Sequence, residues 1–255
     1  MTERRFTFDK IASLYQSARP DYPEALFDDI TAGLNPGARI LEIGSGSGKA
    51  TVAFARRGFS ILAVEPGAEM IRAAQEQLAA FGTVRFVQST FEEWPLDESA
   101  FDLVVAAQSI HWVPPEIAFP KAVRALAPGG TLAVFGNVPM PLSTPIRQEM
   151  ARIYARYNRD EQSRLAEVWY LPSGPLPTLI AQSGCFRSAM HKSYSWTRKY
   201  TSESYVALLG TLSSYLMMDA DTRELLLADI AHAIDTDGGE LELGYETHLY
   251  LAQRL

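Results

Sequence analysis

The stretch that decides the fold is Arg39-Ile-Leu-Glu-Ile-Gly-Ser-Gly-Ser-Gly-Lys-Ala-Thr51. It opens with an apolar run, interrupted by Glu42, of the kind that a buried parallel strand needs. Three glycines follow at alternate positions. Glycine allows a sharp turn at positive φ and lets backbone N–H groups approach a ligand closely. From Lys49 the pattern becomes helical. Strand, glycine turn and helix together predict the first half of a nucleotide-binding βαβ unit.

The spacing of the glycines separates the ligands that use such a turn. A phosphate-binding P-loop requires G-x-x-x-x-G-K-[ST], but here Ile43 replaces the first glycine and Ala50 follows the lysine. The dinucleotide fingerprint places a small residue where this chain has Lys49. The remaining pattern is Glu-x-Gly-x-Gly-x-Gly, formed by Glu42, Gly44, Gly46 and Gly48.

This pattern resembles the first motif of the class I S-adenosylmethionine-dependent methyltransferases. The resemblance is continuous from about Arg39 to Asn137, including the P-G-G turn before the fifth strand. It implies S-adenosylmethionine as cofactor, S-adenosylhomocysteine as product, and a small molecule as methyl acceptor. The pair His111-Trp112 is similar to one in the trans-aconitate methyltransferase-like branch.

A carboxylate closes the second predicted strand, residues 60–65. Glu65 follows Gly44 by about twenty residues, where a nucleotide-binding fold places an acceptor for the ribose hydroxyls. Both oxygens of an ionised carboxylate accept, so one Glu can bind two adjacent hydroxyls. Pro66 turns the chain into a helix over 68–80, in which Met70 is expected to lie near the adenine or to pack in the core.

The third and fourth predicted strands, residues 84–88 and 101–108, lead to two further ligand segments. The resembling family has an acidic adenine contact after the third strand, where this chain has Ser89-Thr90-Phe91. A hydroxyl, a backbone group or packing is expected to replace that carboxylate, and Glu92-Glu93 is interpreted as a solvated helix cap. Gln108 to Trp112 follow the fourth strand at the ligand-binding edge of the sheet.

A leader precedes the first strand. Residues 6–22 resemble the F-D-x-x-A-x-x-Y-x-x-x-R-P-x-Y-P leader of small-molecule methyltransferases, in which the tyrosine and arginine lie near the methionine part of the cofactor. Tyr15, Arg19 and Tyr22 match it, although an amphipathic helix that only caps the sheet explains the same pattern.

The predicted site is summarised by three sets. The catalytic candidates are His111, as a base or substrate contact, and Tyr15. No metal ligands are predicted, since no Cys/His spacing suits a metal. The predicted cofactor contacts are Tyr15, Arg19, Glu42, Gly44, Ser45, Gly46, Gly48, Glu65, Pro66, Met70, Ser89, Thr90, Phe91, Gln108, Ser109 and Trp112.

The segment after the fifth strand is less informative. Helical patterns over 146–157 and 161–169 predict a lid over the substrate, and its arginines admit two interpretations. Spacing of i,i+4 favours a solvated face, whereas one inward guanidinium would suit an anionic substrate. The arginines in question are Arg147, Arg152, Arg156, Arg159 and Arg164.

These patterns predict one methyltransferase domain over 1–255. Its parts are a leader (1–38), a cofactor-binding core (39–138), a helical lid insertion (139–185) and C-terminal strands and helices (186–255). The fold class is α/β, a Rossmann-like doubly wound sheet of seven mostly parallel strands with a helical cap. Right-handed crossovers and the resemblance imply the strand order 3-2-1-4-5-7-6, with the last strand antiparallel.

Composition limits the partners. The chain has 255 residues, a net charge of -7 and a single cysteine, Cys185, which excludes an internal disulfide. The acidic balance argues against nucleic acid, which needs clustered Lys and Arg. The residues Met1 to Lys10 lack a signal-peptide block, and no run reaches membrane-spanning length, so we predict a cytoplasmic protein with no membrane partner. Monomer and homodimer are both compatible with the sequence.

The predicted function is therefore methyl transfer to a small molecule, which the arginines suggest is anionic, by in-line displacement. Two alternatives stay open at this point. A nicotinamide-dependent oxidoreductase would share Glu65 and the glycine turn, and a non-catalytic S-adenosylmethionine-binding protein would share the whole cofactor site.

Overall fold

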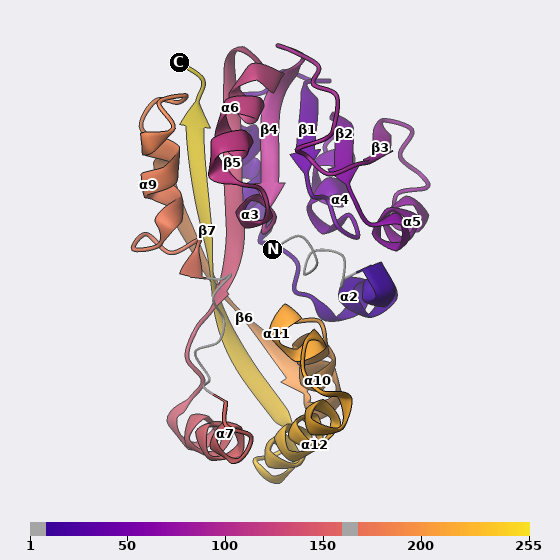
Figure 1. Cartoon of the computed structure of the whole chain (residues 1–255), viewed down its shortest axis with the longest axis vertical. Helices are drawn as coiled ribbons and strands as arrows, with labels where there is room; N and C mark the ends of the chain where they lie inside the picture. Colours follow the sequence, from indigo (N-terminus) through magenta and orange to yellow (C-terminus); the bar gives the residue numbers. More distant parts are fainter. Residues whose placement is uncertain (1–8, 160–167) are drawn as a thin grey trace.

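The computed structural model describes residues 9–159 and 168–255 (Figure 1). The predicted helix over 161–169 and Arg164 thus lie largely or wholly outside the described residues, as do the first residues of the leader motif. The described residues contain one seven-stranded sheet. Its strands are β1 (Arg39–Ile43), β2 (Ser60–Glu65), β3 (Val84–Gln88), β4 (Phe101–Ala107), β5 (Leu126–Pro139), β6 (Met190–Thr201) and β7 (Glu240–Gln253).

The sheet has the order β3-β2-β1-β4-β5-β7-β6, which confirms the predicted topology. Strands β1 to β5 pair in parallel, and β7 is antiparallel to both of its neighbours. The order reverses between β1 and β4, since one crossover runs outward to β2 and the other returns to the opposite side of β1. Open α/β sheets bind ligands at this switch point, beyond the carboxyl ends of the strands.

Helices cover both faces of the sheet. They are α2 (Ala12–Ala18), α3 (Glu24–Thr31), α4 (Lys49–Arg56), α5 (Ala68–Gln77), α6 (Pro115–Ala125), α7 (Thr144–Arg156), α9 (Pro175–Gln182), α10 (Ser202–Gly210), α11 (Ser213–Leu216) and α12 (Ala220–Thr236), with 3-10 turns η1 (Asp9–Ile11) and η2 (Ile110–Trp112). Residues 202–216 form two helices, α10 and α11. The break falls at Thr211 and Leu212.

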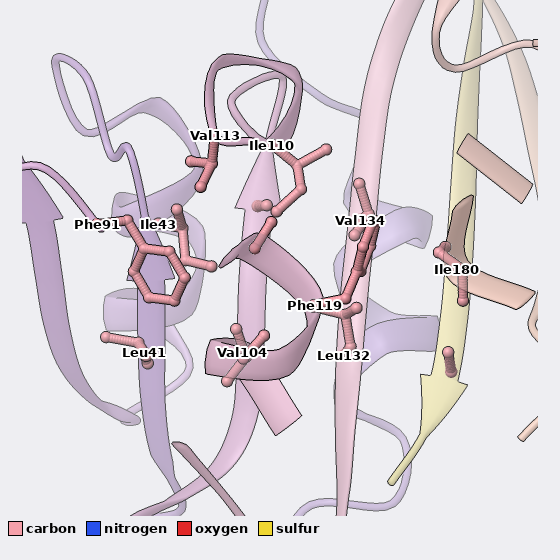
Figure 2. Close-up of a cluster of buried hydrophobic side chains, with 14 of the residues drawn as sticks. Leu41, Ile43, Phe91, Val104, Ile110, Val113, Phe119, Leu132, Val134 and Ile180 are labelled. Carbon is pink, nitrogen blue, oxygen red and sulfur yellow. The ribbon is translucent and has the colours of Figure 1, made fainter. Parts of the chain in front are cut away.

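Two apolar cores result from the alternation of side chains along the strands. Ile40 packs on the face covered by α3 and α4, whereas Leu41, one residue later, packs on the face covered by α6 and α9. Figure 2 shows the second face, with Phe119 of α6 and Ile180 of α9 among the strand side chains. Both faces are therefore dry, as a parallel sheet requires.

A third core lies at the far end of β6 and β7, which extend beyond the other strands (Figure 1). There α7, α10 and α12 surround the sheet extension and bury Ile153, Leu226 and Leu243 together. Helix α7, the described part of the predicted lid, thus packs against α12 in this lobe.

The leader is attached to α5. Asp9 Oδ1 accepts hydrogen bonds from the backbone N–H groups of Glu69 (2.6 Å) and Met70 (3.2 Å), so it satisfies two donors that the first turn of α5 leaves unpaired. Ala12 and Met70 are buried in the same small cluster, with Tyr15 packed against it. Helix α2 also contacts α10. The leader therefore bridges the main sheet and the far lobe.

Among residues 9–159 and 168–255, no helix is both long and apolar enough to span a membrane.

Candidate functional site

A cavity of about 600 Å³ lies at the carboxyl ends of the parallel strands. We name two of its sides. The strand-end wall consists of the lining residues within 42–50, 64–70 and 90–92. These residues lie at the carboxyl ends of β1 and β2 and in the segments after β1, β2 and β3. The closing wall consists of Tyr15, Arg19, Arg159, Trp169 and the lining residues within 212–217. Residues of 107–113, after β4, lie in the cavity lining as well.

The glycine turn borders the cavity closely because its glycines have no side chains to fill the space. Gly44 has φ +65°, and a Cβ atom there would lie 2.7 Å from Ser109 Cβ. The Ser109 hydroxyl donates to the backbone oxygen of Ile43, so the two loops are locked together at this point. Gly46 has φ +54° with nothing within 4 Å of a Cβ position, which leaves its surroundings open.

Glu65 holds the turn from the neighbouring strand. The backbone N–H of Gly46 donates to its Oε2 at 2.9 Å, and that of Gly67 donates to its Oε1 at 2.9 Å. Its side chain is buried, and burial raises its pKa while these two hydrogen bonds oppose the shift. Each carboxylate oxygen has a second lone-pair site. The carboxylate can therefore accept ligand hydroxyls without releasing the turn.

Some polar side chains of the strand-end wall have buried atoms that form no hydrogen bond with the described residues. Glu42 is fully buried; the Thr51 hydroxyl donates to its Oε2 at 2.7 Å, and its Oε1 has no partner among residues 9–159 and 168–255. Burial, with a smaller contribution from Glu65, raises the pKa of Glu42 to about 8. The hydroxyl oxygens of Ser45 and Ser47 also lack partners. Buried polar groups are normally satisfied, so these atoms fit a polar ligand in the cavity.

The segment after β3 differs in part from its sequence interpretation. Thr90 and Phe91 line the cavity, whereas Ser89 does not, since its hydroxyl donates to the backbone oxygen of Thr90. Glu92, which the sequence interpretation places in a solvated cap, also lines the cavity. Glu93 is exposed, and Thr90 caps this turn, since its Oγ1 accepts from the N–H of Glu93 at 3.2 Å. The family pattern of an acidic residue soon after this strand was the signal for Glu92.

One part of the cavity lining, formed by Ile43, Phe91 and Val113, is apolar and continuous with the core. All three residues belong to the cluster in Figure 2 and also line the cavity. A flat apolar group bound there would extend the packed core.

The loop after β4 contributes Gln108 and His111. Gln108 has φ +50°, an uncommon conformation for a non-glycine residue, and its Oε1 accepts from the Tyr22 hydroxyl at 3.2 Å. His111 Nδ1 and the Tyr170 hydroxyl share a hydrogen bond of 3.0 Å. Burial, and secondarily the positive charge of Arg19, lower the pKa of His111 to about 4. His111 is therefore neutral at pH 7.

Two arginines line the closing wall. Arg19 donates to the backbone oxygen of Thr211 at 3.0 Å and lies over the Tyr15 ring at 5.0 Å. Arg159 donates to the backbone oxygen of Ser214 at 3.1 Å and lies over a tyrosine ring at 5.3 Å. Within the described ranges, no carboxylate lies within ion-pair distance of either guanidinium.

The cavity brings together most of the predicted residues. Those that line it are Tyr15, Arg19, Glu42, Gly44, Ser45, Gly46, Glu65, Pro66, Met70, Thr90, Phe91, Gln108, Ser109, His111 and Trp112. Gly48 does not line it: a Cβ atom there would lie 3.1 Å from Ala74 Cβ, so this glycine permits close packing of α4 on α5. The roles of the lining residues toward a ligand stay predictions.

Sequence reasoning missed the segment between α10 and α12. Leu212, Ser213, Ser214 and Met217 line the cavity, although they lie about 170 residues from the glycine turn. No local pattern marks these residues, because the long-range packing of α2 on α10 brings them to the site.

Comparison with known proteins assigns the family. Residues 41–134, which contain the glycine turn, Glu65 and the loop after β4, match the family described as "Methyltransferase domain". The cofactor-binding core is thus that of a class I S-adenosylmethionine-dependent methyltransferase. The match favours this interpretation over a nicotinamide-dependent oxidoreductase.

Relatives of this methyltransferase extend over nearly its whole length. An uncharacterised methyltransferase of Mycobacterium tuberculosis is 28% identical over 239 residues, which cover 90% of this chain and 86% of the relative. An uncharacterised methyltransferase-like protein of Schizosaccharomyces pombe is 25% identical over 256 residues, which cover 97% and 95%. The similarity thus includes the C-terminal lobe as well as the matched domain.

Solved structures share the fold. A protein from Anaeromyxobacter dehalogenans, described as a candidate type II methyltransferase, has a TM-score of 0.66 and 21% identity and covers 92% of this chain and 97% of its own. The phosphoethanolamine N-methyltransferase 2 of Haemonchus contortus, solved with S-adenosylhomocysteine, has a TM-score of 0.56 and 17% identity, covering 96% and 57%. The resemblance to the trans-aconitate methyltransferase-like branch stays a prediction.

Proposed function

We propose that this methyltransferase transfers a methyl group from S-adenosylmethionine to a small anionic acceptor by in-line displacement. One observation carries the proposal. The cavity that contains the glycine turn and Glu65 is also lined by Arg19 and Arg159, neither of which has a carboxylate partner among the described residues. A forked guanidinium donor suits a carboxylate or another planar anion.

The strand-end wall is proposed to hold the cofactor. Glu65 accepts from the ribose hydroxyls, and the turn from Gly44 to Gly46 approaches the methionine part together with the unpartnered oxygen of Glu42. Met70 and Phe91 pack against the adenine, and Glu92 accepts from its amino group. The bound cofactor supplies an electrophilic methyl group on a sulfonium.

The closing wall is proposed to hold the acceptor. With such an electrophile, the residues of the chain have mainly to orient the nucleophile and exclude water. Arg19 and Arg159 orient the acceptor by its negative charge, and Trp112 and Trp169 surround its apolar part. The cavity of about 600 Å³ has to contain the cofactor as well as the acceptor. Because pockets of ~300–1,000 Å³ typically hold one small molecule, the acceptor has to be small.

The proposed cofactor site is tested by calorimetric titration with S-adenosylhomocysteine. The variant Glu65→Ala loses a buried acceptor and is expected to bind at least tenfold more weakly, about 1.4 kcal/mol. Glu98→Ala is the matched control, because Glu98 forms an exposed ion pair with Arg124 away from the cavity. Equal affinities of a folded Glu65→Ala variant and the wild type would remove the ribose role.

The proposed acceptor class is tested by measuring S-adenosylhomocysteine release. Small carboxylates and their uncharged amides are supplied as paired acceptors to the wild-type enzyme. Turnover is expected with members of the carboxylate series only. Turnover of an amide with no carboxylate accepted would show that the acceptor is not anionic.

A further inference from the structure

His111 and Tyr170 form a pair in which only one member reaches the cavity. His111 lines the cavity, whereas Tyr170 is fully buried behind it and does not. The position of Tyr170 is fixed from two sides. The Tyr250 hydroxyl donates to its backbone oxygen at 2.9 Å, and its ring lies against Gly136 of β5, where a Cβ atom would be only 2.7 Å from the ring.

The direction of the hydrogen bond between them follows from the available partners. The Tyr170 hydroxyl makes one hydrogen bond among the described residues, to His111 Nδ1 at 3.0 Å. If Nδ1 donated, the hydroxyl proton would be buried without an acceptor, which is the costly arrangement for a polar group. If the hydroxyl donates, both atoms are satisfied. The tyrosine is therefore the donor and Nδ1 the acceptor.

This direction decides which ring nitrogen carries the proton. A neutral imidazole has one N–H and one bare nitrogen, so an accepting Nδ1 leaves the proton on Nε2. The surroundings favour the neutral ring. Arg19 is positive and so disfavours a charged imidazole, and the hydroxyl of Tyr170 is uncharged. The rings of Trp112 and Trp169, with centroids 4.8 and 6.0 Å from that of His111, are apolar neighbours. Nε2–H has no hydrogen-bond partner among the described residues. The nitrogen left for a ligand is thus a donor.

We propose that His111 is a hydrogen-bond donor to an ionised acceptor oxygen and not a general base, and that Tyr170 is the positioning residue that fixes it in this role. The inference rests on the proposed function and deepens it. Arg19 and Arg159 line the same cavity as further donors without a carboxylate partner among the described residues. Donors of this kind select an acceptor that brings its own negative charge.

An acceptor that arrives ionised needs no base. In the transfer, a bond forms between its oxygen and the methyl carbon, the carbon–sulfur bond breaks, and sulfur keeps the electron pair. The negative oxygen and the positive sulfonium neutralise each other, so no proton moves. The proposed acceptors are therefore compounds with an oxygen acid group that is ionised at neutral pH.

The tautomer is tested directly by ¹⁵N–¹H correlation NMR of the histidine rings in the free protein. The chain has four histidines, and His111→Gln identifies the signals of His111 by their loss. Protonated Nε2 with bare Nδ1, unchanged between pH 5.5 and 8, is the expected pattern. Protonated Nδ1, or titration of the ring near pH 6.5, would overturn the proposal. Because this readout needs neither cofactor nor acceptor, it is independent of the proposed function.

The positioning role is tested with Tyr170→Phe, which removes the donated proton. The His111 ring is expected to change to a mixture of tautomers, while S-adenosylhomocysteine affinity stays within twofold of the wild type. Tyr250→Phe, which keeps the Tyr170 hydroxyl, is the milder second variant, and there the tautomer is expected to persist. A His111 ring unchanged in folded Tyr170→Phe would contradict the role of Tyr170.

Benzoate and its uncharged isostere benzamide test the donor role toward a ligand. In protein saturated with S-adenosylhomocysteine, benzoate is expected to shift the Nε2–H signal of His111 and to bind at least tenfold more tightly than benzamide. His111→Phe is expected to reduce that preference. Equal responses to both compounds, or none to benzoate, would remove the anion-donor assignment, while calorimetry of S-adenosylhomocysteine separately reports on the cofactor site.

Discussion

The two named walls of the cavity are built in different ways. The strand-end wall is made of backbone and buried carboxylates held by the turn itself, as in the bonds from Gly46 and Gly67 to Glu65. The closing wall is made of side chains from three segments that are remote in sequence. Two of them, Arg19 and Arg159, each donate to a backbone oxygen between residues 211 and 214. The first wall is fixed by local sequence, whereas the second exists only after the far lobe has packed. This difference supports the proposed division, in which the strand-end wall holds the cofactor and the closing wall holds the acceptor.

The largest effect is expected from breaking the strand-end wall at Gly44. In Gly44→Ala the new Cβ meets Ser109 at 2.7 Å, and the residue has φ +65°, so steric overlap adds to backbone strain. Affinity for S-adenosylhomocysteine is expected to fall at least a hundredfold, about 2.8 kcal/mol, as measured by calorimetry. The matched control is Gly58→Ala, which has φ +82° but nothing within 4 Å of its Cβ position.

Gly58→Ala is expected to lose only stability, by roughly 1–2 kcal/mol from the left-handed conformation, with cofactor affinity unchanged. Similar affinity losses in both variants would mean that general strain, and not the closed space at Gly44, governs the site.

A pH effect of intermediate size is expected from Glu42. Its pKa is raised from 4.5 to about 8, mainly by burial, so between these values the folded state binds more protons than the unfolded state. Stability therefore falls as the pH rises through this window, by up to ~1.4 kcal/mol per pH unit. Urea unfolding at pH 5.5 and 7.5 measures the slope.

Glu42→Gln keeps the shape of the side chain and has no proton to lose. From pH 5.5 to 7.5, the free energy of unfolding is expected to fall less in this variant than in the wild type. The difference between the two decreases is expected to be at least ~1 kcal/mol. Parallel pH profiles would show that Glu42 is ionised in the folded protein.

A selective effect is expected on the closing wall. Arg159→Ala removes a donor that has no carboxylate partner among the described residues, so benzoate binding is expected to weaken about tenfold, ~1.4 kcal/mol, with S-adenosylhomocysteine affinity within twofold. Arg152→Ala, which breaks an exposed ion pair with Glu149 on α7, is the control and is expected to change neither affinity. Loss of cofactor affinity in Arg159→Ala would mean that the walls do not divide the ligands as proposed.

The same difference decides how much was predictable from the sequence. The sheet order and the residues of the strand-end wall follow from strand periodicity, glycine spacing and the position of Glu65, all of which are local. The sequence pattern also assigned Gly48 to the ligand, whereas in the fold the missing side chain lets α4 pack closely on α5, which local sequence does not reveal. Segment 212–217 could not be predicted, since its place in the cavity depends on α10 contacting α2 across about 190 residues of chain.

The smallest effect is expected where the leader joins the two walls. Asp9 caps α5 by accepting from Glu69 and Met70, and α5 supplies Met70 to the cavity. Asp219 caps α12 in the far lobe in the same way, by accepting from the N–H of Thr222 at 3.0 Å. Each Asp→Ala variant is expected to lower the free energy of unfolding by ~1 kcal/mol, measured in urea.

The two caps differ in what depends on them. Asp9→Ala also loosens the leader that carries Tyr15 and Arg19, so its affinity for S-adenosylhomocysteine is expected to fall two- to fivefold, less than ~1 kcal/mol. Asp219→Ala is expected to leave that affinity unchanged, since α12 supplies no described residue to the cavity lining. Hydrogen exchange at residues 68–71 provides the second readout and should rise in Asp9→Ala only. Equal affinities in the two variants would show that the leader is a cap for the sheet and takes no part in holding the cofactor.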